Sequence, residues 1–155
     1  MSIEEKLQAL GLELPPAPAP AANYVPYVLE GGQLFVSGQV PLGADGKLAY
    51  VGKVGRDMDE RQGYQSARLC ALNALAQINA ALGSLDKVKR VLSIRGFVNC
   101  TDDFTNQPEV INGASDLLVE IFGDIGRHAR AAVGTNALPR GVTTEVEMVV
   151  AVTVS

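Results

Sequence analysis

Two short runs of alternating apolar residues open the patterned part of the chain. Residues 25–29 and 34–40 are rich in β-branched and aromatic side chains, which favours strands. The Gly31-Gly32 pair between them has the backbone freedom that a tight turn requires, so a hairpin is predicted. Residues 51–55 could add a brief strand or form a loop.

Two longer segments carry the three-to-four-residue spacing of helices. The first, 57–82, can be capped by Asp57 or Asp59 and ends at Gly83. Its apolar stripe is widened by alanines, which predicts close packing against a flat surface. A second helix is predicted over 110–122.

The remaining apolar runs predict three more strands, over 88–99, 129–135 and 144–154. The resulting order is ββ(β)αβαββ. This order is typical of an α+β domain in which two helices cover one face of a largely antiparallel sheet.

Alternation assigns the faces of these strands. In 88–99, Val88, Leu92 and Ile94 fall on one face, with Val91 and Phe97 on the other. The helix-facing set of the last strand is Val146, Met148, Val150, Val152 and Val154. Its opposite face is also half apolar, although a sheet covered on one side should be polar on the other. We therefore expect sheets from several subunits to pack together.

The N-terminal 23 residues differ from the rest of the chain. Residues 2–10 predict a short helix with Ser2 as its cap, and the following proline-rich segment predicts an extended strap over the surface. Because so few residues precede the strap, it is not a domain linker. We expect one domain over residues 1–155, with 1–23 as its N-terminal helix and strap.

Composition excludes several function classes. The net charge is −4 and aromatic residues make up 5%, so the basic footprint and stacking platforms of nucleic-acid binding are missing. No apolar run is long enough to span a bilayer, and the first residues lack the plan of a signal peptide, so a cytoplasmic protein is expected. The chain has one histidine, and Cys70 and Cys100 form no CxxC pair, which predicts two buried reduced thiols and no metal site.

Arg130 is the first candidate for chemistry. It opens a strand between alanines, and its planar guanidinium suits bidentate binding of a carboxylate. Alternatively, it forms an ion pair with Glu145 or Glu147, or extends to the rim of the sheet.

Three further residues have two interpretations each. Glu145 could position a water beside an anion-binding arginine, or could simply end a strand in solvent. His128 could shuttle protons or be an ordinary loop histidine. Gly38, in the SGQVPL segment, could let a ligand approach the backbone or mark a bulge.

The order and spacing of these motifs resemble the RidA/YjgF family of reactive intermediate (imine) deaminases, in a longer-chain branch. Ser37-Gly38-Gln39 is followed by Pro41, Arg130 precedes Leu138-Pro139, and the Glu-x-Glu strand begins at Glu145. An Asp103-Phe104 pair follows the central strand in the family's order, and the likeness runs from Tyr24 onward.

The resemblance implies a chorismate-mutase-like (bacillus-type) α+β fold and a homotrimer whose sheets form a central barrel, with three clefts between subunits. The implied activity is hydrolysis of enamine/imine intermediates of the 2-aminoacrylate type to 2-keto acids and ammonia, without a cofactor. The longer segment between Phe104 and Arg130, and the N-terminal strap, depart from the shorter deaminases.

The resemblance also implies roles for individual residues. Arg130 would bind the substrate carboxylate, and Glu145 would orient the attacking water. Tyr24 and Ser37 would line the cleft. Ala132 stands where many members have cysteine, but its backbone N–H can still bind the carboxylate. The substrate-binding set is then Tyr24, Ser37, Gly38, Ala132 and His128.

Two functions therefore compete. As an enzyme, the protein would need both Arg130 and Glu145. As a non-catalytic trimer that binds a keto acid or regulates a partner, it would need Arg130 alone. A ribonuclease, an activity attributed to some family members, is disfavoured by the acidic charge and the single histidine. For both the enzyme and the binding protein, the expected partner is a small metabolite that bears a carboxylate.

Overall fold

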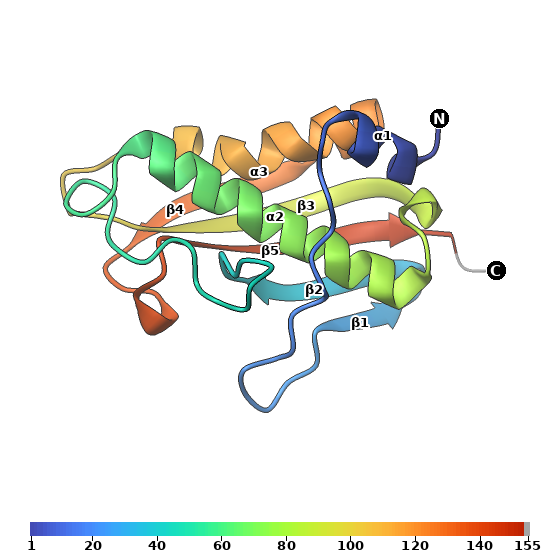
Figure 1. Cartoon of the computed structure of the whole chain (residues 1–155), viewed down its shortest axis with the longest axis horizontal. Helices are drawn as coiled ribbons and strands as arrows, with labels where there is room; N and C mark the ends of the chain where they lie inside the picture. Colours follow the sequence, from blue (N-terminus) through green and yellow to red (C-terminus); the bar gives the residue numbers. More distant parts are fainter. Residues whose placement is uncertain (154–155) are drawn as a thin grey trace.

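The protein is a five-stranded sheet with helices on one face (Figure 1). The computed structural model describes residues 1–153. Its helices are α1 (Ile3–Ala9), α2 (Glu60–Leu82) and α3 (Gln107–Phe122), with short 3-10 turns η1 (Leu85–Lys87), η2 (Gly123–Gly126) and η3 (Pro139–Gly141). Its strands are β1 (Tyr27–Glu30), β2 (Gln33–Gln39), β3 (Val88–Asn99), β4 (Ala129–Thr135) and β5 (Thr144–Val152).

The strand order is β1-β2-β5-β3-β4. Only the β3–β4 pair is parallel, because α3 carries the chain back between those two strands, and the other pairs are antiparallel. This arrangement confirms the predicted α+β fold with a largely antiparallel sheet and two long helices on one face.

Helices α2 and α3 pack closely against each other over the sheet (Figure 1). The contact depends on Gly113 of α3, because a Cβ atom there would collide with the backbone carbonyl of Tyr64 in α2. Side chains from both helices meet the buried side of β3 and β5 to form the hydrophobic core.

The ends of the long helices follow local rules, with small shifts from prediction. Asp59 and Gln62 form a reciprocal capping box at the start of α2, and Gly83 ends it with a φ of 83°. Asp57 lies before the helix, where it accepts a hydrogen bond from the Lys53 backbone. Helix α3 begins at Gln107, earlier than predicted, because proline is well tolerated in a first turn.

The predicted faces of β3 were wrong for two residues. Val91 is buried with Val88 and Ile94, whereas Leu92 is only partly buried. The register of β3 against β5 shifts twice, between Val88 and Arg90 and between Val91 and Ser93. Each such irregularity breaks strict alternation, so a side chain expected on the outer face turns into the core.

Two other strand predictions were also adjusted. Residues 51–55 form isolated bridges rather than a strand, which decides the open alternative in favour of a loop. The first strand begins at Tyr27, since Pro26 has no N–H to donate to a ladder. In β5 the predicted alternation is confirmed through Val152, and Val154 lies outside the described residues.

The face of the sheet opposite the helices is partly apolar, as predicted. Val28 is 49% exposed, Phe35 44% and Val133 46%. Phe35 pairs with Val149 of β5, which places apolar side chains next to each other across three strands. These exposed apolar side chains form a contiguous patch, whereas a surface exposed only to water usually has them scattered singly.

The N-terminal helix and strap run over the helical layer (Figure 1). Ser2 and Glu5 form the capping box of α1, and the Ile3 N–H donates to Asp86 of η1 at 2.9 Å. The strap then crosses α2, where the Gln77 amide donates to the Pro18 carbonyl. Among the described residues, no helix combines the length and hydropathy needed to cross a bilayer.

Candidate functional site

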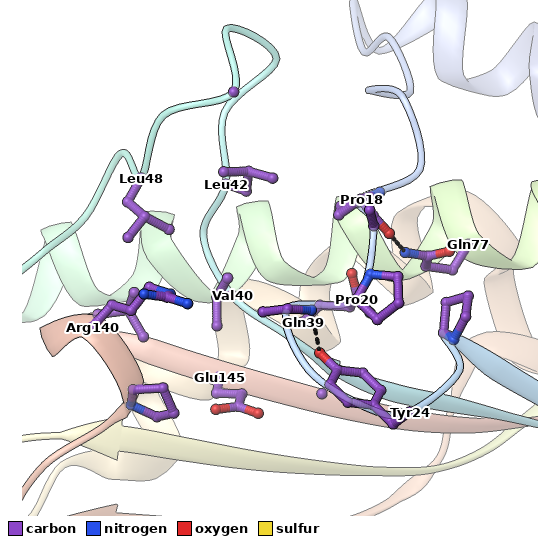
Figure 2. Close-up of a pocket in the computed structure, with 17 residues that line it drawn as sticks. Pro18, Pro20, Tyr24, Gln39, Val40, Leu42, Leu48, Gln77, Arg140 and Glu145 are labelled. Atoms are coloured by element: carbon purple, nitrogen blue, oxygen red, sulfur yellow. Dashed lines mark hydrogen bonds between the residues drawn. The ribbon is translucent and has the colours of Figure 1, made fainter.

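A cavity of about 370 Å³ lies beneath the strap. Pro18 and Pro20 of the strap, with Tyr24 just after it, form one wall, and Glu145 lies on the floor (Figure 2). Arg140 lies across the cavity from Tyr24. The cavity is therefore mainly apolar, with one carboxylate and one guanidinium available to a ligand.

Glu145 is held in this cavity without a polar partner. Strand alternation buries Thr144 and Val146 and leaves Glu145 half-buried on the other face. Its carboxylate has no hydrogen bond or ion pair within residues 1–153. Burial, and secondarily the charge of Glu147, raises the pKa of Glu145 above its ordinary value. A carboxylate with a raised pKa and free oxygens is suited to accepting a proton from water.

Gly38 lies directly against Glu145. The register of β2 shifts between Val36 and Gln39, which confirms the bulge interpretation of this segment. A Cβ atom at position 38 would collide with the Glu145 carboxylate. Glycine at position 38 therefore lets the Glu145 carboxylate keep its present position, which a side chain there would displace.

Tyr24 and Ser37 connect this cavity to a second hollow on the outer face of the sheet. Tyr24 lines both, and its hydroxyl accepts a hydrogen bond from the Ala21 N–H at 3.3 Å. Ser37 lies in the second hollow, and its hydroxyl donates to the Val25 carbonyl at 2.7 Å. Glu147 lines the same hollow.

Arg130 lies on the edge strand β4 and points toward α3. Its Nη1 donates to Ser115 Oγ at 3.0 Å, and its Nη2 donates to the Pro108 carbonyl at 3.2 Å. Glu147 instead pairs with Arg95 at 3.2 Å, and Glu145 has no ion pair within residues 1–153. The alternative in which Arg130 pairs with either glutamate is therefore wrong for this chain.

His128 extends the hydrogen bonds of Arg130. Its Nδ1 lies 2.6 Å from the Gly126 carbonyl, and its Nε2 lies 2.8 Å from Ser115 Oγ. Since a carbonyl can only accept, Nδ1 carries the proton and Nε2 of the neutral ring accepts from Ser115. Burial lowers the pKa of His128, and the charge of Arg130 lowers it further against the opposing effect of the Gly126 bond. Ala132 lies two residues along β4, packed against the core.

The predicted site residues thus form two groups in one chain. Tyr24, Gly38 and Glu145 meet in the cavity, with Ser37 adjacent. Arg130 and Ala132 lie on β4 and His128 directly precedes that strand, with their side chains on the helical side of the sheet. Arg130 is in register with Ile94, a core residue, whereas Glu145 is opposite Phe97, so the two side chains lie on opposite faces.

The two cysteines are buried and unpaired, as predicted. Cys70 lies against Thr144, and burial raises its pKa to about 12. Cys100 lies near Gln107 at the end of β3. A thiol with a raised pKa is protonated at neutral pH and is a poor nucleophile.

Comparison with known proteins identifies the family. The family model described as "YjgF/chorismate mutase-like, putative endoribonuclease" matches residues 4–150. The protein belongs to the YjgF family. Protein TCP17 of Trypanosoma cruzi is 48% identical over 149 residues, which cover 96% of this chain and 92% of that protein.

Two solved structures share the fold with this YjgF protein at close to full length. Atu1372 of Agrobacterium tumefaciens, described as a protein of unknown function, is 47% identical, with a TM-score of 0.91 over 97% of this chain and 92% of that one. A Shewanella oneidensis protein described as a "putative endoribonuclease" is 39% identical, with a TM-score of 0.95 over 98% of this chain and 100% of that one.

More distant YjgF structures carry the names RidA and TdcF. RidA from Psychrobacter sp. PAMC 21119 is 25% identical, with a TM-score of 0.62 over 88% of this chain and 94% of that one. Escherichia coli TdcF with bound serine is 22% identical, with a TM-score of 0.62 over 88% and 94%. The latter likeness concerns the fold alone.

Two residues of this YjgF protein's candidate site were missed in the sequence. Ser115 sits in mid-helix with no motif around it, and only the return of the chain through η2 brings it to His128. Arg140 was visible in the LPRG segment, but its place in the cavity depends on a left-handed backbone with a φ of 59°. Neither contact has a local signal in the sequence.

Proposed function

We propose that this protein hydrolyses enamine/imine intermediates of the 2-aminoacrylate type to 2-keto acids and ammonia. The observation that carries the proposal is the half-buried Glu145 carboxylate, which has no partner within residues 1–153 and lines a mainly apolar cavity. An unpaired buried carboxylate costs stability, so it is typical of a site retained for chemistry.

The reaction needs little acid–base apparatus. An enamine first becomes its imine tautomer, and the protonated C=N carbon is already electrophilic. Glu145 accepts a proton as water adds to that carbon and passes it to the nitrogen of the resulting carbinolamine. The C–N bond then breaks as the hydroxyl oxygen becomes the carbonyl, and the hydroxyl proton leaves with the nitrogen as ammonium. The products are a 2-keto acid and ammonium, so no redox cofactor or metal is required for the balance of atoms and electrons.

The substrate carboxylate is assigned to Arg130. Two of its N–H groups are used by Ser115 and Pro108, and the remaining donors have no partner within residues 1–153. Because Arg130 and Glu145 face opposite sides of one sheet, we propose that each site combines Arg130 of one subunit with Glu145 of another. The apolar outer face around Phe35 supports packing of the sheets in a homotrimer.

A protein with the same fold, TdcF, has been solved with bound serine, which also carries a carboxylate. Serine and 2-aminoacrylate share the three-carbon carboxylate frame. A site of this size and lining also accepts larger side chains, so several imino acids are expected as substrates.

The proposal is tested by release of ammonia. Imines are generated in situ from several amino acids, and the rate of ammonia release is measured with and without the protein. The wild-type protein should accelerate release, and Arg130→Ala and Glu145→Gln should each lose most of the acceleration.

Binding is measured in parallel by calorimetry with 2-oxobutyrate. Glu145→Gln should still bind, whereas Arg130→Ala should bind at least about thirtyfold more weakly because a charged contact in a partly desolvated cleft is lost. Binding without ammonia release by the wild-type protein would contradict the enzyme and support the binding module. A monomer in sedimentation at micromolar concentration would contradict the shared site.

A further inference from the structure

A series of hydrogen bonds links Arg130, Ser115 and His128. The proposed reaction uses only Arg130 of these three side chains. Arg130 donates to Ser115 Oγ at 3.0 Å, Ser115 lies 2.8 Å from His128 Nε2, and His128 Nδ1 lies 2.6 Å from the Gly126 carbonyl. All three side chains are half-buried. Each bond is within ordinary hydrogen-bond length, so the series is continuous from the guanidinium to the backbone.

The direction of these bonds is determined by chemistry. The Gly126 carbonyl oxygen can only accept a hydrogen bond. In neutral His128 the proton therefore lies on Nδ1, and Nε2 has a lone pair. Ser115 then gives its one proton to Nε2, so its oxygen lone pairs face Arg130. A protonated His128 would instead donate from Nε2 to Ser115 Oγ, which has a second lone pair to accept from Arg130, so the link is kept in either protonation state.

The charged groups around His128 leave Arg130 as its main electrostatic neighbour. Asp124 of η2 pairs with Arg127 at 3.5 Å. Arg90 of β3 donates to the Arg127 backbone carbonyl rather than to the imidazole. No carboxylate within residues 1–153 lies within ion-pair distance of His128.

The acidic groups of α3 face other partners. Asp116 accepts a hydrogen bond from Tyr64 at 2.7 Å, and Glu120 pairs with Arg68 at 3.1 Å, both on α2. Glu109 is exposed at the start of the helix. The imidazole therefore has a guanidinium nearby and no compensating anion.

We infer that Ser115 and His128 are positioning residues that orient the Arg130 guanidinium for anion binding, and that the protonation of His128 is coupled to the occupancy of that anion site. The inference rests on the proposed assignment of the substrate carboxylate to Arg130. It goes beyond the proposed function because Ser115 and His128, which do not contact the reacting atoms, would set the ligand affinity of the site and the pH dependence of that affinity.

The sign of the coupling follows from charge. Without ligand, the Arg130 charge and burial both disfavour imidazolium, so His128 is neutral at neutral pH. A bound carboxylate neutralises Arg130 and removes that repulsion, which raises the pKa of His128. By linkage, a keto acid must bind more tightly as the pH falls through the range in which His128 takes up its proton. The carboxylate of the keto acid stays ionised in this range.

The test combines calorimetry and NMR. Binding of 2-oxobutyrate is measured between about pH 5 and pH 8 in the Glu145→Gln protein, so that Glu145 does not titrate. In this background, affinity should increase severalfold toward low pH. Adding His128→Gln, which can still accept from Ser115 but carries no charge, should leave affinity near the high-pH value and abolish the pH dependence.

Matched variants separate positioning from a general loss of structure. Ser115→Ala and His128→Asn remove the link and should weaken binding about fivefold to tenfold with little change in melting temperature, whereas Ser115→Thr should restore it. Since the chain has one histidine, its imidazole NMR signals are unambiguous. The pKa of His128 should rise in Arg130→Gln and on saturation with 2-oxobutyrate.

The outcomes distinguish the two proposals. If the wild-type protein does not bind 2-oxobutyrate or any keto acid tested, the proposed function fails. If binding requires Arg130 but is unchanged in Ser115→Ala and His128→Asn, and is flat with pH, this inference alone fails. A His128 pKa that is the same in the wild type and Arg130→Gln would overturn it whether or not a ligand binds.

Discussion

Arg130 and Glu145 lie on opposite faces of the same sheet. Arg130 is in register with the buried Ile94 and bonds to Ser115 of the covering helix, whereas Glu145 is opposite Phe97 and lies in the cavity under the strap. One chain therefore cannot bring these two side chains to one small ligand. A site that uses both must be assembled from two copies.

Subunit mixing tests this directly. Arg130→Ala and Glu145→Gln should each be inactive alone. Proteins unfolded together and refolded as mixed oligomers should regain activity, because about a quarter of the interfaces would then join an intact Arg130 to an intact Glu145. Ammonia release by the mixture is compared with that of the two variants refolded separately. No recovery, with mixed oligomers verified by mass spectrometry, would contradict a shared site.

Gly38→Ala should damage the site through a single methyl group. The added Cβ would collide with the Glu145 carboxylate, so we expect a loss of about 1 to 3 kcal/mol in the free energy of unfolding and a loss of activity. Glu145→Ala removes the obstacle. In urea unfolding, the double variant should therefore be less destabilised than the sum of the two single variants, and simple additivity would show that the collision is not the cause.

Glu145→Gln should be more stable than the wild type at neutral pH. The pKa of Glu145 is raised by folding above its ordinary value of 4.5. At pH values just above 4.5, the folded state therefore binds more protons at Glu145 than the unfolded state does. The free energy of unfolding then falls as the pH rises through this range. Glutamine has no such cost. The difference in melting temperature should shrink toward about pH 3, where Glu145 is protonated in both states. Glu13→Gln, an exposed strap position, is the control and should show no difference.

Cys70 and Cys100 should be unreactive and dispensable. Both are buried, and the pKa of Cys70 is raised to about 12. A thiol reagent at about pH 8 should label neither in the native protein and both after unfolding. The Cys70→Ala/Cys100→Ala protein should lose about 1 to 3 kcal/mol of stability but keep its rate of ammonia release. Loss of turnover in a folded double variant would implicate a thiol in the chemistry.

Much of the architecture could be predicted from local patterns. Both long helices, the hairpin and the alternation of β5 follow from spacing, caps and glycine positions, because these depend on residues close in sequence. The faces of β3 could not be predicted, since its two register shifts arise from how β3 fits against β5. The left-handed Arg140, likewise, depends on the path of the whole β4–β5 connection.

The sequence alone determined the candidates for chemistry: an always-charged Arg130 on an apolar strand, a Glu145 and Glu147 pair on one strand face, and a single His128. Only the tertiary structure decided what each one faces. Glu147 pairs with Arg95, while Glu145 is left without a partner within residues 1–153. The hydrogen bonds from Arg130 to Ser115 and His128 join an edge strand to the helix above it. Strand alternation fixes a side chain's face only relative to its neighbours, whereas its partners depend on elements distant in sequence that pack against that face.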